Sequence, residues 1–291
     1  MKSSKHLPRQ LAAAAAVAAL GGLVLSAGPA SATPTLPPAL AMYANCPVQN
    51  PEVSSCVYIE THNTQLKIGK FNLQTAGPVT LEFGLKYPAS NNYEPLSVAP
   101  TNGHAILTSP AIEVPGGIFG IPGAGVGALA AYVTPELTAL PTVNIDNLLT
   151  GQGTALGLKM RAKVNNPFTN ALSMLGPGCY IGSASSPISL NLTTGTTAPP
   201  APNKPITGSI APGTAEGWGI DFANTKTVDN AFAAPGATGC GTPFGWLNST
   251  VNAIAGTPAA AGTNTAVMTS DIHITDANEV REALGMADVY Q

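Results

Sequence analysis

The sequence is poor in charged residues. Asp, Glu, Lys and Arg make up 9% of its 291 positions, against roughly 25% in ordinary soluble domains. Thr, Asn, Ser, Gly and Pro supply the polarity instead, a composition that suits a secreted β-rich protein. Aromatic residues are also few, at 5%, and this argues weakly against a secreted glycosidase, which would stack sugar rings on aromatic side chains.

Motifs of several common chemistries are missing. The chain has no G-x-S-x-G elbow, which exposes the nucleophile of many hydrolases. It has no C-x-x-C pair and no histidine beside a cysteine, so a zinc site is not expected. A G-x-G-x-x-A match at Gly123, Gly125 and Ala128 follows a Pro- and Gly-rich run rather than a strand. We therefore predict no cofactor.

The first 32 residues have the three-part pattern of a secretory signal peptide. Lys2, Lys5 and Arg9 precede an apolar run over residues 11–25, and Ala-Ser-Ala at 30–32 offers an A-x-A cleavage site. The alternative, an uncleaved membrane anchor, is disfavoured because the apolar run is short. We predict a secreted, extracellular protein that is cleaved near Ala32 and has no stable transmembrane anchor.

Loss of this leader leaves nine basic residues against 15 acidic ones, a net charge of −6. Nucleic acid and anionic membranes are therefore not expected as partners, because both require a basic face.

The mature chain contains four cysteines, as export permits. Cys46, Cys56, Cys179 and Cys240 allow three disulfide pairings. We favour Cys46–Cys56 and Cys179–Cys240, because each bridge then lies within one region of the chain.

Alternating apolar and polar residues predict β-strands in several segments. In PVTLEFGLK, Val79, Leu81, Phe83 and Leu85 share one face, and ALGLKMRAKV repeats the pattern over residues 155–164. PISLNLTT and AVMTSDIHI are further strands. We predict a mainly β fold, an antiparallel sandwich or distorted barrel with two or three short helices. The expected organisation is a flexible lead at 33–55 and one domain at 56–291. The proline-rich stretch at 195–213 is either a surface loop within this domain, which we favour, or a linker.

Two helices are expected near the C-terminus. Thr242 and Pro243 suit a helix start, and apolar residues follow at helical spacing at 244, 247, 251 and 254. Asp276 and Glu279 suit the start of a second helix. A third is expected near 127–137, and the Gly-rich apolar segment 115–133 is most simply interpreted as a buried loop that leads into it.

Three groups of residues are candidate functional sites. Lys159, Arg161 and Lys163 form a basic stripe on one face of a strand, either a solvated face or a binding stripe for a cell-wall polyanion. Asp271 and His273 share a strand face, and the pair is either an ordinary surface pair on an edge strand, which we favour, or the acid–base half of a hydrolytic site. Other candidates for a hydrolase are scattered, namely His62, His104, Glu60, Glu82, Glu94, Glu113 and Glu136. The segment 115–133 is a candidate for insertion into a membrane or partner.

Two segments resemble a family of uncharacterised secreted proteins of actinobacteria, namely GPGCYIGSASSPISLNLTTGTTAPPAPNKPITG and VDNAFAAPGATGCGTPFGWLNSTVNAIAGTPAAAGTNTAVM. The resemblance covers roughly residues 155–275, with Cys-Tyr-Ile-Gly and Gly-Cys-Gly signatures at Cys179 and Cys240. The resemblance implies that the protein is exported and that Cys179 and Cys240 belong to one structural unit. It implies no catalytic residue for this chain.

The function that the sequence favours is a non-enzymatic binding or structural protein, extracellular or associated with the cell envelope, of unknown ligand. A secreted hydrolase is the first alternative. A protein that inserts into a membrane or partner through residues 115–133 is the second.

Overall fold

A computed structural model describes the greater part of the chain. The described ranges are 35–86, 98–101, 104–117, 130–166, 175–217, 219–241 and 244–288. All belong to the compact unit that begins at Pro34. The predicted signal peptide and most of the segment 115–133 lie outside the described residues.

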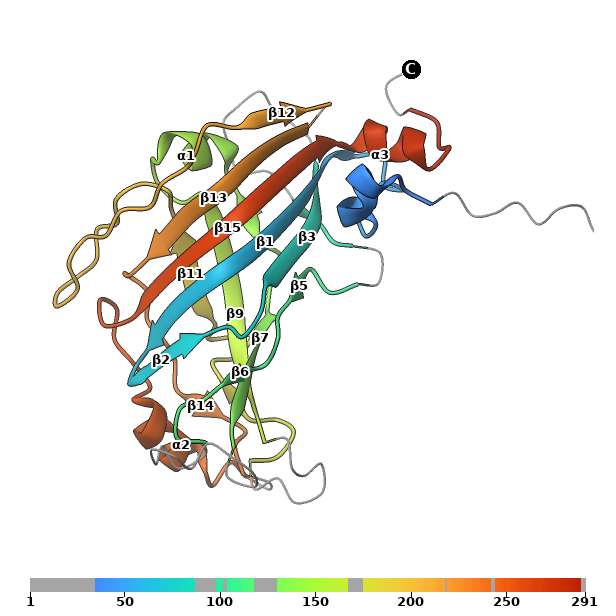
Figure 1. Ribbon diagram of the computed structural model, residues 1–291. Helices are drawn as coiled ribbons and strands as arrows, with labels where there is room; N and C mark the ends of the chain where they lie inside the picture. The colour runs from blue at the N-terminus through green and yellow to red at the C-terminus, as the bar shows by residue number, and fades with distance from the viewer. Residues whose placement is uncertain are drawn as a thin grey trace, which may run out of the picture. The chain divides into compact units, whose positions relative to one another are not determined.

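The first of two sheets has eight strands among the described residues (Figure 1). Their order is β12 (Thr214–Glu216), β13 (Gly219–Asp229), β15 (Thr265–Asp276), β1 (Val53–Ile68), β3 (Val79–Lys86) and β4 (Val98–Ala99), with β2 (Phe71–Gln74) beside β1 and β5 (Leu107–Thr108) beside β3. All pairs are antiparallel, and the long central strands β1 and β15 are in register from Ser55–Asp276 to Lys67–Thr265.

The second sheet has seven strands in the described part of the chain. Their order is β14 (Ala237–Thr238), β10 (Tyr180–Ile181), β9 (Leu156–Asn165), β7 (Tyr132–Leu137) and β6 (Ile112–Glu113), with β11 (Ile188–Leu192) and β8 (Thr142–Val143) also beside β9. Strand β9 is its centre, since four other strands pair with it.

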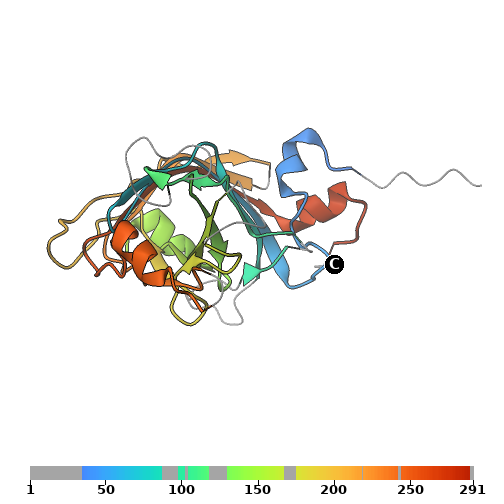
Figure 2. The ribbon, with the colours of Figure 1, turned by 90° about the horizontal axis from the view of Figure 1, so that it is seen from below.

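The two sheets face each other across one hydrophobic core (Figure 2). Phe83 from the first sheet and Leu158 and Leu190 from the second are at most 2% exposed. The inward residues of β9 are those that period-2 alternation selects, while Lys159 on the same strand is exposed. The predicted β-sandwich with short helices is confirmed.

The helices partly follow the predictions. Helix α3 (Ala277–Ala283) begins as expected, with the Asp276 side chain accepting the N–H of Asn278. Helix α2 (Asn248–Ala255) starts later than predicted, because Phe244 has φ +74° and stands outside the helix, fully exposed. The helix expected to reach residue 137 is wrong: residues 132–137 form β7, which pairs with β9. Helix α1 (Ile145–Thr150), which was not predicted, is capped by Asn144.

The segment expected as a flexible lead is packed against the sandwich from Pro38 onward, which corrects that prediction. It forms a 3₁₀ helix, η1 (Pro38–Tyr43), and supplies Val48 and Val53 to a second small core with α3. Arg281 of α3, only 1% exposed, donates to the carbonyls of Val48, Asn50 and Val53. These three carbonyls, together with the Asn278 side chain that accepts from Nη1, satisfy the buried guanidinium and fix the segment.

Both disulfides have the pairing favoured from the sequence, Cys46–Cys56 and Cys179–Cys240. The second joins the residue before β10 to the loop after β14. The proline-rich segment 195–213 is a loop held on the sandwich rather than a free linker. Thr196 and Ser209 make bridges to Thr207 and Lys226, and the Asn203 amide donates to two backbone carbonyls.

Candidate functional site

An apolar cavity of about 100 Å³ lies between the two sheets. Strands β1, β2, β3 and β15 form one wall, and β6, β7, β9, β10 and β11 form the other. Helix α2 contributes Val251, Ile254 and Ala255 at one end of the sandwich, where it lies beside β14 (Figure 1). The cavity is therefore a product of the whole fold and not of one segment.

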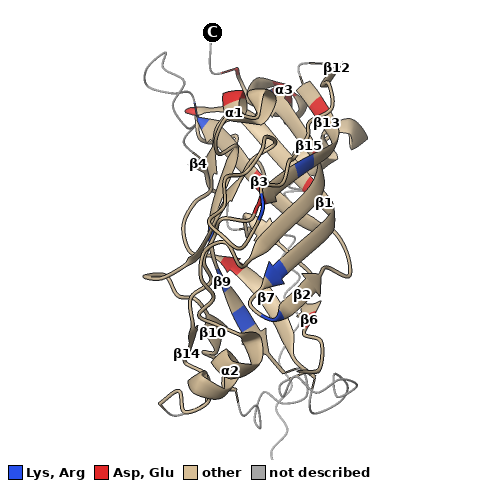
Figure 3. Cartoon of the chain, turned by 90° about the vertical axis from the view of Figure 1, so that its left-hand side faces the viewer, with Lys and Arg blue, Asp and Glu red and all other residues tan. Residues whose placement is uncertain are grey.

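The walls contain no charged group among the described residues. They are built mainly from the inward-facing residues of the strands, which are every second residue. Examples are Leu66 and Ile68 of β1 and Leu158, Met160 and Ala162 of β9. Helix α2 and strand β14 carry no charged residue (Figure 3). An apolar, water-poor space of this kind favours an apolar occupant.

Four hydroxyl groups interrupt the apolar lining. Thr61 Oγ1 lies 2.8 Å from Ser270 Oγ, and Ser109 Oγ donates to the carbonyl of Pro110 at 2.9 Å. The hydroxyls of Thr64 and Thr75 are buried and have no hydrogen-bond partner among the described residues. The oxygens of Thr64 and Thr75 have almost no accessible surface, so the part of the lining that is open to the cavity is nearly all apolar.

A smaller cavity of about 40 Å³ lies next to the first. The two share Thr61, Leu81 and Met268 in their walls. The smaller one continues between β1, β3 and β15 on one side and α1 and β8 on the other. The two cavities therefore share part of one wall.

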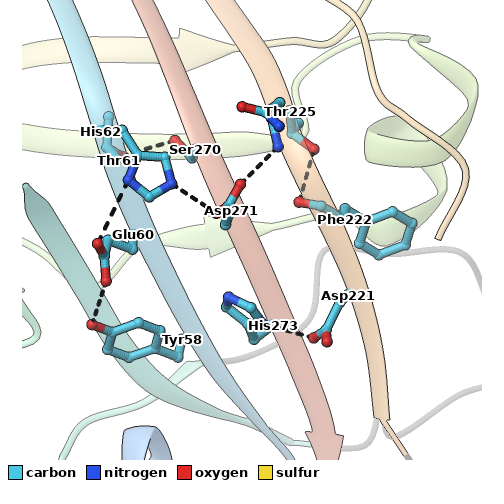
Figure 4. Close-up of polar contacts among 11 residues, drawn as sticks. Tyr58, Glu60, Thr61, His62, Asp221, Phe222, Thr225, Ser270, Asp271 and His273 are labelled. Carbon is cyan, nitrogen blue, oxygen red and sulfur yellow. Dashed lines mark hydrogen bonds and ion pairs between the residues drawn. The ribbon is translucent and has the colours of Figure 1, made fainter. Parts of the chain in front are cut away.

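The outer surface of the first sheet holds the second candidate site, a polar row of six side chains (Figure 4). Its members are Tyr58, Glu60, His62, Asp221, Asp271 and His273. His62 Nε2 lies 2.7 Å from Asp271 Oδ2, and His273 Nδ1 lies 2.7 Å from Asp221 Oδ1. The expected grouping of Asp271 with His273 is therefore corrected, because each side chain contacts a partner on a neighbouring strand.

His273 and Asp221 are directly opposed in the register of β13 and β15, whereas two β-bulges supply the partners of Asp271. On β1 the register shifts between Thr61 and Asn63, which leaves His62 as an extra residue. On β13 it shifts between Phe222 and Thr225. Asn224, at φ +54°, donates its backbone N–H to Asp271 Oδ1 at 2.7 Å. Bulges redirect side chains in this way, and here two of them converge on one carboxylate.

The contacts of the row shift two pKa values. Partial burial opposes the ionisation of Asp271, but the N–H of Asn224 and the His62 imidazole outweigh it, so the pKa of Asp271 lies below its usual value. Burial and the hydrogen bond that Tyr58 donates to Glu60 raise the pKa of Tyr58 to about 12. Tyr58 is therefore a neutral donor at ordinary pH.

The row lacks the geometry of a serine hydrolase. The hydroxyl nearest in sequence, Ser270, faces the inside of the sandwich and contacts Thr61, on the opposite side of the sheet from Asp271 (Figure 4). The Tyr58 hydroxyl is engaged by Glu60. An imidazole and a carboxylate are thus paired without an aligned nucleophile in the described structure.

The remaining predicted site residues are dispersed. Glu82 accepts a hydrogen bond from Asn45, and Glu94 lies outside the described residues. His104 and Glu113 are exposed and take part in no ion pair within the described ranges. Nowhere in those ranges do three or more His, Cys, Asp or Glu side chains gather as a metal site would require. No helix formed by the described residues is long and apolar enough to cross a membrane.

The basic stripe lies on the outer face of β9, as its alternation predicts. Its central member, Arg161, makes two hydrogen bonds to Glu136, the shorter at 2.8 Å, and its guanidinium lies 4.0 Å from the centre of the Tyr180 ring. Lys159 is exposed, and Lys163 is half-buried. Since Glu136 neutralises the central charge, polyanion binding by the stripe stays a prediction.

Comparison with known proteins gives no match to any family model, curated protein or solved structure.

Sequence reasoning missed the cavity residues Thr64 and Thr75. Their only signal is register: both are inward positions at which a hydroxyl replaces the aliphatic side chain of neighbours such as Leu66 and Leu73. Threonine is common in β-strands, so these two residues stand out only once the structure shows both walls of the cavity.

Proposed function

We propose that the mature chain is a secreted, non-enzymatic binding protein that holds an apolar molecule between its two sheets. The observation that carries this proposal is the uncharged cavity of about 100 Å³ at the centre of the sandwich. Protein interiors are normally close-packed, and apolar cavities on the order of 150 Å³ bind molecules such as benzene. The signal-peptide pattern and the two disulfides support export.

A binding role accounts for the separation of the cavity from the imidazole–carboxylate pairs better than a hydrolytic role does. The imidazole–carboxylate pairs lie on the outer face of the first sheet, whereas the cavity lies on its inner face. Substrate held in the cavity would be separated from these pairs by the sheet itself. The resemblance to secreted actinobacterial proteins adds the setting, the outside of the cell or its envelope, and stays a prediction.

Filling the cavity tests the proposal. Ala162 lines it at the centre of β9, so Ala162→Leu places extra methyl groups in the empty space. We expect the mature protein to bind the neutral fluorophore N-phenyl-1-naphthylamine and the variant to bind it at least tenfold more weakly. Thermal unfolding of the ligand-free variant should stay within a few degrees of the original, because the new side chain fills a void.

Ala215→Leu, on an exposed position of β12, is the matched control and should bind the fluorophore normally. If Ala162→Leu fails to fold, Ala131→Leu provides a second block, since Ala131 also lines the cavity. Absence of fluorophore binding, or equal binding by folded blocked variants, would refute the proposal.

A further inference from the structure

Two aromatic side chains are exposed on the turn that precedes α2. Phe244 is 100% exposed and Trp246 is 57% exposed, and no other aromatic side chain in the described ranges is as exposed. Since α2 begins at Asn248, this turn lies at the end of the sandwich that α2 occupies (Figure 1). We call residues 244–246 the aromatic tip.

The chain around the aromatic tip holds it in place. The N–H of Gly245 donates to the Gly241 carbonyl at 2.8 Å, and the N–H of Leu247 donates to the carbonyl of the disulfide-bonded Cys240 at 3.0 Å. Leu247 packs against the main core. The Trp246 ring lies so close to Gly241 that a Cβ on this glycine would be 2.9 Å from it. The exposed aromatic residues are therefore carried on an ordered turn.

The backbone of Phe244 has a conformation that its side chain disfavours. Its φ of +74° lies in the left-handed region, which bulky residues rarely adopt and which glycine or asparagine adopts more easily. Because the side chain is fully exposed, no packing within the described chain offsets this cost. Strained residues of this kind are concentrated at binding sites. The position of Phe244 is thus explained better by a contact outside the chain than by folding.

The surroundings of the aromatic tip favour a partner without charge. Residues 230–270 contain no Asp, Glu, Lys or Arg. Lys70 donates to the Ala253 carbonyl at 2.8 Å, near the other end of α2. Two aromatic side chains bury roughly 150–250 Å² each, well below the area of about 1,000 Å² that a specific protein interface needs. The same two side chains are sufficient for shallow insertion among lipids, where tryptophan is favoured at the boundary with water.

We propose that the aromatic tip inserts into the surface of an electrically neutral lipid bilayer. Phe244 supplies a wholly apolar ring, and Trp246 adds a ring whose N–H can donate a hydrogen bond at the level of the headgroups. This contact goes beyond the proposed function and does not depend on it. Helix α2 connects the two, because it supplies Val251 and Ile254 to the cavity wall. The end of the sandwich that α2 occupies would thus face the phase in which apolar molecules dissolve.

Sedimentation with phosphatidylcholine vesicles measures this contact. We expect the mature protein to bind the vesicles and the double variant Phe244→Asn/Trp246→Ser to bind them at least tenfold more weakly, because burial of one aromatic side chain alone is worth about that factor. Added salt should leave the binding unchanged. Phosphatidylglycerol in the vesicles should not strengthen it, since the aromatic tip has no basic residue.

Leu149→Ser is the matched control. Leu149 is 49% exposed on α1, at the opposite end of the sandwich from α2 (Figure 1, Figure 3), so vesicle binding should be unchanged. Phe244→Asn alone should weaken binding and unfold at the same temperature as the original protein or higher, because asparagine tolerates a positive φ. A role of Phe244 in packing would instead lower the unfolding temperature.

Trp246 also reports on its own surroundings. The chain has two tryptophans, so Trp218→Phe leaves Trp246 as the only one. Its fluorescence emission should shift to shorter wavelength when phosphatidylcholine vesicles are added, since the ring then leaves water.

The outcomes separate this inference from the proposed function. Lipid contact by the aromatic tip is refuted if the original protein does not bind the vesicles, or if the folded double variant binds them equally well. Vesicle binding that leaves the Trp246 emission unshifted also refutes it. Binding of N-phenyl-1-naphthylamine, measured without vesicles, tests the cavity alone. The double variant should retain it, because neither Phe244 nor Trp246 lines the cavity.

Discussion

Asp271 accepts hydrogen bonds from two different strands, and this sets its protonation behaviour. His62 of β1 and the backbone N–H of Asn224 on β13 both favour the ionised carboxylate. Together they outweigh the partial burial that raises its pKa, so the pKa of Asp271 is lower in the folded chain than in the unfolded one. A group of this kind stabilises the fold above the unfolded pKa and stops doing so as pH falls through the folded value.

We therefore predict a component of acid unfolding that belongs to Asp271. As pH falls below about 4, the usual pKa of an aspartic acid, the free energy of unfolding should decrease. Asp271→Asn should remove part of this dependence and lower stability by roughly 1 kcal/mol at neutral pH, a typical contribution of a partly exposed charge-assisted bond. Urea unfolding at a series of pH values measures both effects.

Glu282→Gln is the comparison variant, because Glu282 is an exposed carboxylate on α3. It should leave the acid slope close to that of the original protein. An Asp271→Asn variant with an unchanged slope would contradict the assignment.

Single residues were predictable from sequence only where their neighbours in the chain decide their contacts. Asp276 caps α3 because its acceptor geometry depends on the next two residues. Asp271 and His273 share a face as predicted, but their partners are His62 and Asp221, which lie 209 and 52 positions away in the chain. No local pattern locates the two bulges that bring those strands into place.

At the scale of elements, alternation predicted the strands well, whereas capping and helical spacing predicted the start of α3 but not that of α2. The inward residues of β3, β9 and β11 are buried as their patterns require. Residues 132–137 became a strand because pairing with β9 overrides local propensity. Helix α2 starts at Asn248, where the Asn248 side chain accepts the backbone N–H of Cys240.

This contact couples a disulfide to the cavity. Cys179–Cys240 fixes the loop that holds Asn248, and α2 then supplies Val251 and Ile254 to the cavity wall. Replacing Cys179 and Cys240 by serine should cost about 4 kcal/mol by the chain-entropy model. It should also weaken binding of N-phenyl-1-naphthylamine several-fold under conditions where the variant is folded.

Replacing Cys46 and Cys56 by serine is the matched control. That bridge closes a shorter loop, with a sequence separation of 10 against 61, and should cost roughly 3 kcal/mol. Its cysteines belong to the small core with α3 and do not line the cavity, so fluorophore affinity should be retained. Equal losses of affinity in the two variants would contradict the coupling through α2.

At the scale of the whole molecule, the cavity depends on how two sheets are placed against each other. Alternation shows that each strand has an inner face, but not how much space the opposing faces leave. Leu81 of β3 and Met160 of β9 are distant in sequence and contribute to the same cavity. For this reason the fold class was predictable from sequence, while the candidate binding site was not.

The most direct test of the proposed binding role uses methionine methyl groups as reporters. Met160 and Met268 line the cavity, whereas Met42 and Met286 pack on the separate small core beside α3. NMR spectra of methyl-labelled mature protein should be recorded during titration with 1-octanol. Saturable shifts of the Met160 and Met268 methyl signals, with those of Met42 and Met286 unmoved, are the predicted result. Binding of 1-octanol that leaves Met160 and Met268 unmoved would contradict it, as would the absence of any saturable shift.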